Sequence, residues 1–402
     1  MINIAILGFG VVGSGVAELL TQNRDVIEKT TGERVSLKYV VDIREFPESP
    51  FKDLVVHDFA VVERDPDVSV VIETIGGARV AYDFTRRALA AGKSVVTSNK
   101  ELVATHGPEL LALAEEKGCT YLFEAAVGGG IPVLKPMVTE LGHNRIKAVS
   151  GILNGTTNYI LTRMFRGGVD FATALKEAQA NGYAEADPTA DIEGHDACRK
   201  IAILAAIAFG EMVPTEKIHT EGITAIRGED VKAASSIGAS VKLLGRAIGT
   251  DAGVYVLVAP FVVGADFALA HINDVYNGVS VLGDFVGDVM FYGRGAGSYP
   301  TASAVVSDVC ALLARRAPKY VFGEDDSILA DFATFSSGRY LALTGVGKGE
   351  ISRVFGEVKY LDGAAGECAF IAEEMTEAVL EEKLDAIKSA GATVLSSIRV
   401  MG

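Results

Sequence analysis

Residues 3–13 read NIAILGFGVVG, a short apolar run followed at once by three spaced glycines. Gly8, Gly10 and Gly13 satisfy the pattern G-x-G-x-x-G, and a helical pattern continues from the last of them. In this setting the first glycine permits a tight turn, the second lets the backbone approach a pyrophosphate, and the third allows close helix packing. A structural glycine turn is the alternative, but the flanking strand and helix favour a dinucleotide-binding loop.

Further short β-rich runs follow this loop, with helical patterns between them. Nearly continuous apolar runs of this kind are typical of parallel strands buried on both faces. Residues 1–130 are therefore expected to form an α/β domain with a Rossmann-type, doubly wound parallel sheet. A later glycine loop feeds a helix at 300–318, which we expect to return to this domain. The runs are SLKYVV (36–41), VSVVIET (68–74), SVVTS (94–98) and TYLFEA (120–125).

The pattern changes after residue 130, where a hinge marked by glycine and proline, VGGGIP, leads into a second domain. We expect residues 131–300 to form an α+β domain with a mixed sheet, in which 197–210 is a buried helix and 253–300 adds strands. Residues 336–402 show strand, helix and strand patterns and are expected to form a separate small βαβ-type unit.

Composition limits the class of protein. A chain of 402 residues exceeds the usual size of one core, and a net charge of −15 argues against nucleic acid or anionic membrane as partner. The four cysteines are scattered without a C-x-x-C pair, which favours a reducing compartment. The first residues lack the basic region of a signal peptide, and no apolar run is long enough to span a bilayer. We expect a cytoplasmic protein.

The second predicted strand ends in VVDIR, where Asp42 is the natural candidate for a ribose hydroxyl. Arg44 and Lys52 follow closely and could instead neutralise a 2′-phosphate. One acid and two bases do not separate NAD from NADP, and the pattern slightly favours use of both.

The stretch 183–200, YAEADPTADIEGHDACRK, carries five acidic side chains before a basic end. Asp196 and Lys200 are four residues apart, so they share one face of the predicted buried helix. A surface ion pair is one interpretation. Because a lysine at the start of an interior helix loses its proton more easily, a proton acceptor is the favoured one. Asp187 precedes a proline and is expected to shape a turn.

Lys100 lies in TSNKEL (97–102), at the end of the fourth predicted strand and so on the ligand edge of the sheet. An ordinary lysine at a helix start is the alternative to a group facing cofactor and substrate. A nicotinamide protein with a lysine base and nearby carboxylates is suited to oxidise an alcohol that carries an ammonium group.

Several long motifs in sequence order resemble the homoserine dehydrogenase family over the whole chain. Members of that family oxidise L-homoserine reversibly to L-aspartate 4-semialdehyde with NAD or NADP, in the biosynthesis of threonine, methionine and isoleucine. The motifs are GFGVVG, ETIGG, TSNKEL, FEAAVGGGIP, GILNGTTNYIL, AQANGYAEADPTADIEGHDACRK and GAGSYPTASAVVSD.

The resemblance implies roles for individual residues. Lys200 and Lys100 match the catalytic lysines, Glu185 and Asp196 match substrate-binding carboxylates, and Asp191 lies in the same polar pocket. The family's cofactor contacts match Phe9, Val11, Val12, Thr74, Lys100, Gly182 and Gly297.

The resemblance also implies a monovalent cation, typically sodium, held by Glu124 and by the backbone carbonyls of Val127, Gly129 and Ile131. It implies a homodimer formed through the second domain, with a dimer of dimers as the larger alternative. The C-terminal unit resembles the ACT module, which binds amino-acid effectors. Segment 346–363 lacks the usual Asp-Arg-Pro-Gly turn of that module.

Two rival functions remain to be compared. A dinucleotide-binding regulatory protein without chemistry would need the glycine loop but neither Lys200 nor Asp196. Another amino-acid dehydrogenase or a semialdehyde dehydrogenase is the second rival, and the acylating type needs a cysteine nucleophile in a strand–helix turn. Neither Cys119, Cys198 nor Cys310 is in such a turn, which weakens that rival.

Overall fold

The computed structural model describes residues 1–401, and its N-terminal part is the predicted parallel sheet. The strands lie in the order β3-β2-β1-β4-β5-β6, and every pair is parallel. The apolar side chains of β4, β5 and β6 are buried, as a sheet covered on both faces requires, whereas β2 and β3 at one edge are partly exposed. The strands are β1 (Ile2–Leu7), β2 (Val35–Val41), β3 (Val55–Val56), β4 (Val68–Glu73), β5 (Ser94–Thr97) and β6 (Tyr121–Leu122).

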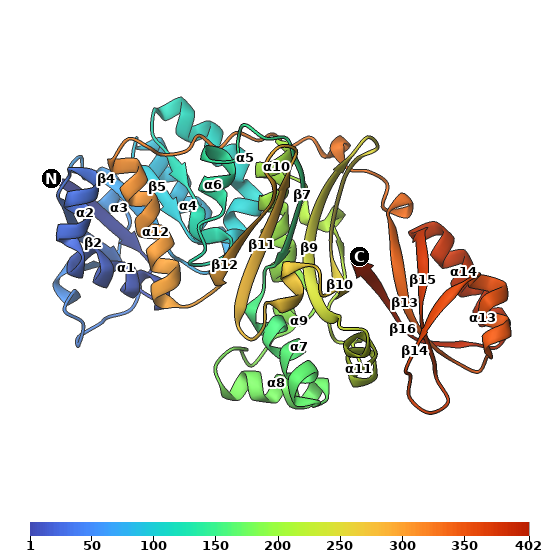
Figure 1. The fold of residues 1–402 in the computed structure, drawn as a ribbon. Helices are drawn as coiled ribbons and strands as arrows, with labels where there is room; N and C mark the ends of the chain where they lie inside the picture. Colours follow the sequence, from blue (N-terminus) through green and yellow to red (C-terminus); the bar gives the residue numbers. More distant parts are fainter. Residues whose placement is uncertain (402) are drawn as a thin grey trace.

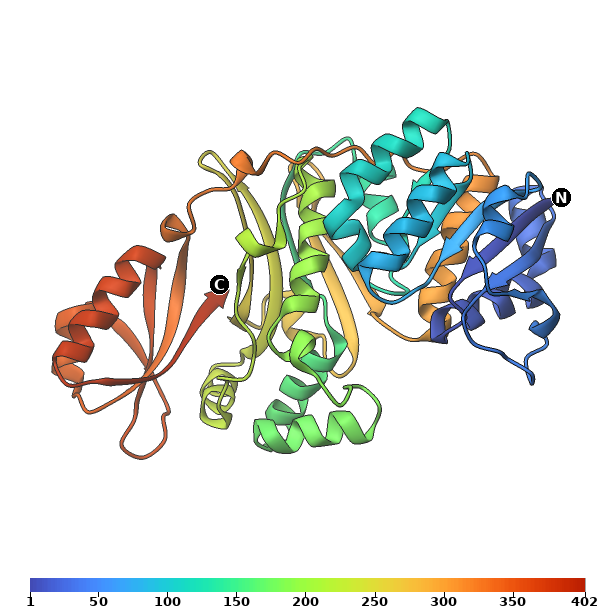
Figure 2. The same ribbon diagram turned by 180° about the vertical axis from the view of Figure 1, so that it is seen from behind.

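Helices cover both faces of this sheet (Figures 1 and 2). The late helix α12 (Ser298–Leu313) packs beside α1 (Val11–Gln22) and α2 (Arg24–Thr31), and Figure 1 shows it in orange among the blue N-terminal elements. On the opposite face α4 packs on α5. The remaining helices of this part are α3 (Ala60–Arg64), α4 (Ala78–Ala90) and α5 (Lys100–Lys117).

The strand order reverses between β1 and β4, and the glycine loop follows β1 at that point. In open α/β sheets, ligands bind outside the carboxyl ends of the strands where the order reverses. The topology therefore directs a cofactor to the glycine loop and to the segments that follow β4 and β5.

The central part is a mixed sheet with helix α10 lying across one face, against β7, β9 and β10 (Figure 2). Its strands are β7 (Ile146–Ile152), β8 (His219–Thr220), β9 (Ser240–Thr250), β10 (Gly253–Val263), β11 (Tyr276–Gly283) and β12 (Gly287–Arg294). Its helices are α6 (Leu134–Thr139), α7 (Gly155–Gly167), α8 (Phe171–Ala180), α9 (Thr189–Ile192), α10 (His195–Phe209) and α11 (Gly228–Ser236). Short 3-10 turns are η1 (Lys52–Leu54), η2 (Glu124–Ala126), η3 (Thr215–Lys217), η4 (Ala268–His271), η5 (Asp326–Ile328) and η6 (Phe332–Thr334).

The C-terminal part has the order β-α-β-β-α-β, which is fuller than the βαβ-type unit expected from sequence. The sequence patterns missed α13 and β14, because both are short and only partly buried. The elements are β13 (Ser336–Thr344), α13 (Lys348–Phe355), β14 (Val358–Leu361), β15 (Cys368–Thr376), α14 (Glu377–Ser389) and β16 (Thr393–Met401).

Strand pairing joins the C-terminal unit to the central part. Strand β16 pairs in parallel with β10 from Phe261↔Arg399 to Val263↔Met401, so the central and C-terminal strands form one ten-stranded sheet. The C-terminal unit nevertheless has its own apolar cluster under its two helices, which includes Leu341, Ile351 and Phe370.

Three further boundaries differ from the sequence patterns. The helical pattern after the glycine loop is broken at Asn23, where α1 ends and α2 begins. Strand β6 is only two residues long, because the chain turns at η2 and brings Glu124 to the next helix. The mixed sheet contains a strand before residue 253 that the sequence patterns did not mark, since β9 runs from Ser240 to Thr250. No helix in the described residues 1–401 is long and apolar enough to cross a membrane.

Candidate active site

A cavity of about 580 Å³ lies between the ligand edge of the parallel sheet and the central part of the chain. Ten of the residues singled out from sequence line it: Val11, Val12, Lys100, Gly129, Gly182, Glu185, Asp191, Asp196, Lys200 and Gly297. None of the four cysteines lines it, so the residues offer no thiol nucleophile for an acylating semialdehyde dehydrogenase. The cavity therefore brings the proposed substrate residues together with part of the proposed cofactor set. The other proposed cofactor residues do not line it: Gly8, Phe9, Gly10, Gly13, Asp42, Arg44 and Thr74.

Helix α10 carries the two residues at the centre of the cavity. The helix is apolar and buried along most of its length, as predicted from its sequence. Gly194 precedes it with φ +84°, a backbone conformation that favours glycine, and the first turn then presents Asp196 inward. One turn further, Lys200 projects from the same face because residues four apart are neighbours on a helix.

Lys200 is held on two sides by acceptors. Its Nζ donates to Oδ2 of Asp196 at 2.6 Å and to the backbone carbonyl of Leu153 at 2.7 Å. Burial lowers the pKa of Lys200, the charge of Lys100 lowers it further, and the charge of Asp196 opposes them. The net direction is downward, so this amine releases its proton more readily than an exposed lysine.

Lys100 reaches the same carboxylate from the other domain. It is the first residue of α5, its side chain is 40% exposed, and its Nζ lies 2.9 Å from Oδ1 of Asp196. Burial alone would raise the pKa of Asp196, but the charges of Lys200 and Lys100 outweigh it and hold that pKa well below its usual range. Asp196 is therefore an ionised carboxylate shared by two lysines.

Asn154 is a functional candidate that the sequence reasoning missed. Its amide nitrogen donates to Oδ1 of Asp191 at 2.7 Å and to Oδ2 of Asp196 at 2.8 Å, so one amide joins two carboxylates. Its side-chain oxygen accepts from the backbone of Thr157 and caps helix α7. The motif GILNGTTNYIL places this asparagine directly before a helix, and that position is the one local sign of its capping role. Burial and the nearby charge of Asp196 raise the pKa of Asp191.

The acidic residues upstream of α10 have different surroundings. Glu185 lines the cavity but is exposed, and Gly182 beside it has φ +72°. Asp187 accepts from the backbone of Thr189 at 3.1 Å, which confirms the predicted turn. The stretch is thus divided between turn formation and the lining of the cavity.

The glycine loop has the geometry expected of a phosphate-binding turn. A Cβ on Gly13 would lie 2.0 Å from the carbonyl oxygen of Gly8, whereas a Cβ on Gly10 would meet nothing within 4 Å. Gly10 is the N-cap of α1 and supplies no side-chain cap, so the first N–H groups of that helix are free for an anion. Thr74 donates to the carbonyl of Gly8 at 2.8 Å and ties β4 to this loop.

Asp42 and Arg44 form a pair beside the loop. Asp42 accepts from the backbone N–H of Phe9 at 2.7 Å, while Arg44 donates to both of its oxygens at 3.0 and 2.9 Å. The hydrogen bond from Arg44 holds the pKa of Asp42 well below its usual range. The ring of Phe9 is buried and packs against Phe46, so Phe9 contributes to the glycine loop through its backbone. The segment after β2 thus carries an ionised acid and a guanidinium side by side.

A buried acid joins the ends of β4 and β5 under the loop, and it too was missed. Glu73 accepts from the hydroxyl of Thr97 and from the backbone of Ile75, and burial raises its pKa to about 7. The ETIGG motif placed this residue at the ligand edge but gave no sign that its side chain points inward.

The hinge after β6 is organised by Glu124, which is 1% exposed. Its carboxylate accepts backbone N–H groups of Val133, Leu134 and Lys135 at 2.6 to 2.9 Å, and so caps α6. The carboxylate that is expected to bind a cation thus already accepts three backbone donors. Within residues 1–401 no cluster of three or more His, Cys, Asp or Glu could hold a metal ion.

Known proteins resemble the chain in both of these domains. A family model described as homoserine dehydrogenase, NAD binding domain, matches residues 8–124, and one described as homoserine dehydrogenase matches residues 132–310. Homoserine dehydrogenase from Synechocystis sp. is 45% identical over 315 residues, which cover 77% of this chain and 72% of that protein. The Bacillus subtilis enzyme is 42% identical over 315 residues, covering 78% and 73%.

Solved structures extend the similarity to the C-terminus. A homoserine dehydrogenase from Thiobacillus denitrificans superposes with a TM-score of 0.89 at 34% identity and covers 100% of this chain and 98% of its own. A hyperthermophilic archaeal homoserine dehydrogenase mutant, solved in complex with NADPH, has a TM-score of 0.67 at 27% identity, covering 78% and 98%. The matches to both domain models and the identities above 40% over three quarters of the sequence show that this chain belongs to the homoserine dehydrogenase family of oxidoreductases.

Proposed function

We propose that this protein oxidises L-homoserine reversibly to L-aspartate 4-semialdehyde with NAD or NADP, in the route to threonine, methionine and isoleucine, and that Lys200 is its general acid and base. The observation that carries the proposal is the meeting of Lys100, Lys200 and Asp196 in the cavity, with Nζ to oxygen distances of 2.9 and 2.6 Å. A buried amine with a lowered pKa next to an ionised carboxylate is suited to proton transfer near neutral pH.

In the oxidation direction, the substrate hydroxyl gives its proton to Nζ of Lys200 while its carbon loses hydride and becomes a carbonyl. A bound nicotinamide supplies the acceptor for that hydride. Lys100 lies on the cofactor side of Asp196 and would hold the reacting oxygen as its charge develops. In the reverse direction the protonated Lys200 returns the proton to the forming alcohol.

The substrate ammonium would be bound by the carboxylates on α9, on α10 and in the loop before them. Asp191 and Asp196 are joined by Asn154, and Glu185 lies at the exposed side of the cavity. Three carboxylates around one cation favour an amino acid over a neutral alcohol, because their negative charges pair with the ammonium and offset the cost of removing it from water.

For the cofactor, the free N–H groups at the start of α1 fit a pyrophosphate, and the open space above Gly10 lets the phosphate approach. Asp42 would accept the ribose hydroxyls of NAD. Arg44, together with Lys52, would bind the 2′-phosphate of NADP after leaving Asp42. The NADPH complex of the archaeal relative supports use of NADP, and the paired acid and base support use of both.

A monovalent cation fits the hinge through backbone oxygens. Within residues 1–401 no hydrogen bond ends on the carbonyls of Val127, Gly129 or Ile131, although all three residues are buried. Such oxygens suit a hard cation like sodium. Glu124 would add a carboxylate oxygen to these carbonyls, since its three backbone N–H donors leave one of its accepting positions open.

We further propose three functional units: residues 1–130 with helix 300–318, residues 131–300, and residues 336–402 as an ACT-like unit that could take an amino-acid effector. A homodimer through the second unit is supported by the hairpin between β11 and β12, where Phe285 is 92% exposed. The four free cysteines support residence in the reducing cytoplasm.

The direct test follows nicotinamide absorbance with purified protein, L-homoserine, and NAD or NADP in separate assays, each with and without L-threonine and with sodium or a bulky organic cation. Turnover with at least one cofactor is expected. Absence of turnover with both, from neutral to alkaline pH, would remove the enzymatic proposal.

A further inference from the structure

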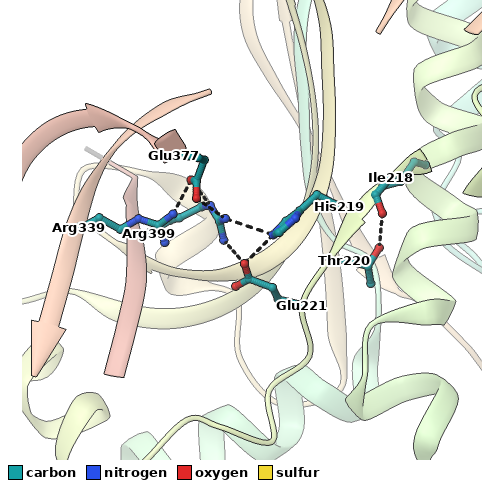
Figure 3. Close-up of polar contacts among 7 residues, drawn as sticks. All are labelled: Ile218, His219, Thr220, Glu221, Arg339, Glu377 and Arg399. Atoms are coloured by element: carbon teal, nitrogen blue, oxygen red, sulfur yellow. Dashed lines mark hydrogen bonds and ion pairs between the residues drawn. The ribbon is translucent and has the colours of Figure 1, made fainter. Parts of the chain in front are cut away.

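Arg399, on the last strand β16, is among the largest fully buried side chains of the protein and is 1% exposed. Its guanidinium reaches across the junction between the C-terminal and central parts. Nη1 donates to Glu221 at 2.8 Å, Nη2 approaches Nε2 of His219 at 3.2 Å, and Nε donates to Glu377 at 3.0 Å (Figure 3). A buried charge is tolerated only when its partners remain in place, so this contact resists separation.

A second buried arginine, Arg339, also binds Glu377 but stays within the C-terminal unit (Figure 3). It lies on β13, is 3% exposed, and its acidic partner opens α14. Arg399 shares that partner and adds Glu221 and His219 from the central part. The two arginines therefore have similar burial and one common carboxylate, while only Arg399 joins the two parts.

The partner Glu221 begins a segment that packs directly on helix α9. A Cβ on Gly222 would lie 2.2 Å from the carbonyl oxygen of Ile192, so the two backbones are in close contact. The N–H of Ile223 donates to that same carbonyl at 2.8 Å. A Cβ on Gly194, the N-cap of α10, would lie 3.2 Å from the carbonyl oxygen of Glu221. Segment 221–223 thus rests on the junction of α9 and α10.

That junction carries the carboxylates of the cavity. Asp191 is on α9, one residue before Ile192, and Asp196 is in the first turn of α10. The amide of Asn154 holds both, so a shift of α9 would separate Asp191 from the pair while Lys200 keeps its own bonds to Asp196 and Leu153. The path from Arg399 to Asp191 therefore runs through Glu221, segment 221–223 and Ile192.

Burial alone would raise the pKa of Glu221, but the hydrogen bond from His219 and the charge of Arg399 outweigh it and lower that pKa to about 2. The carboxylate is thus ionised at neutral pH. Without Arg399 it would be left partly buried with His219 as its neighbour, and its move toward water would loosen the packing of segment 221–223 on α9, although the N–H of Glu221 still donates to Val258.

We propose that Arg399 is a positioning residue for the active site: by holding Glu221 it fixes segment 221–223 against α9 and keeps Asp191 in place for the substrate ammonium. The inference rests on the proposed role of Asp191 in substrate binding. It assigns to the C-terminal strand a part in substrate affinity that requires no effector.

The test compares four full-length variants by steady-state kinetics, at a temperature below the melting point of each. R399Q is expected to raise KM for L-homoserine about tenfold, with kcat and the KM for cofactor within about twofold of wild type, because ground-state binding is lost and chemistry is retained. E221Q, which changes the other partner of the contact, should raise KM for L-homoserine by a similar factor. The KM of R399Q/E221Q for L-homoserine should be no higher than that of either single variant, since both substitutions remove the same contact between Arg399 and Glu221.

The matched control is R339Q, which also removes a buried guanidinium from Glu377 and should leave KM for L-homoserine unchanged. An unchanged KM in both R399Q and E221Q, an equal rise in R339Q, or additive effects in the double variant would each overturn the proposal. If R399Q does not fold, E221Q against R339Q decides the question. Failure of wild type to oxidise L-homoserine would instead count against the proposed function.

Discussion

Nζ of Lys200 lies 2.6 Å from Oδ2 of Asp196, one turn apart on the same buried helix. The opposite oxygen of that carboxylate faces Lys100 from the other domain at 2.9 Å. Asp196 therefore lies between two amines, and burial together with the charges of Asp196 and Lys100 sets the proton affinity of Lys200.

This arrangement predicts opposite shifts in the pH dependence of two variants. The charge of Asp196 raises the pKa of Lys200, so D196N should lower that pKa and move the rising limb of kcat for homoserine oxidation to lower pH. The charge of Lys100 lowers the same pKa, so K100M should move the limb to higher pH. The midpoint of the limb is the measured quantity, and shifts in the same direction would contradict the electrostatic account.

Asn154 should affect both substrate binding and stability. N154A removes the cap of α7, at about 1 kcal/mol of stability, and releases Asp191 from Asp196, so KM for L-homoserine should rise about tenfold or more. Asp170 caps the next helix, α8, on the exposed surface, and D170A provides the control. Chemical denaturation should show a similar loss in the free energy of unfolding for N154A and D170A. If the KM of N154A for L-homoserine equals that of D170A, Asn154 acts only as a cap.

The glycine loop should separate folding from cofactor binding. G10A has room for its methyl group, so its melting temperature should stay near that of wild type while its cofactor Kd rises about tenfold or more. In G13A the methyl group would collide with the carbonyl of Gly8. The free energy of unfolding should therefore fall by about 1 kcal/mol or more, as at other overpacked sites. Thermal melts and cofactor titrations measure the two effects. A cofactor Kd of G10A equal to that of wild type would contradict the binding of a phosphate at Gly10.

Arg44 should distinguish the two cofactors. In R44A the 2′-phosphate loses its guanidinium, whereas Asp42 becomes free for the ribose hydroxyls of NAD. The KM for NADP should therefore rise about tenfold or more, with the KM for NAD unchanged or lower. Steady-state kinetics with both cofactors at fixed L-homoserine provides the comparison, and equal effects on the two would place Arg44 outside the ribose site.

The sequence was most informative where one local pattern determines both structure and chemistry. The apolar run and glycines of residues 3–13 predicted β1, α1 and the loop between them, since turn geometry leaves few alternatives. The four-residue spacing of Asp196 and Lys200 likewise predicted that both project from one face of an interior helix, and the structure shows the two side chains buried together. In both cases the relevant contacts are between residues close together in the chain.

Contacts over long sequence separations could not be predicted in this way. The amide of Asn154 meets Asp191 and Asp196 across about forty residues, and Glu221 meets Arg399 across 178. Neither pair has a local signature, because each depends on how β7, α9 and β16 are placed by the mixed sheet. The parallel pairing of β16 with β10 was missed for the same reason, since a strand pattern does not specify its partner.

The central claim is that Lys200 transfers the proton. It is tested most directly by the kcat of K200A for L-homoserine oxidation, measured by nicotinamide absorbance, beside a titration of cofactor binding. A general base contributes about 10²- to 10⁴-fold, so kcat should fall by at least about a hundredfold while the cofactor Kd stays near that of wild type. A kcat within a few-fold of wild type would contradict the account.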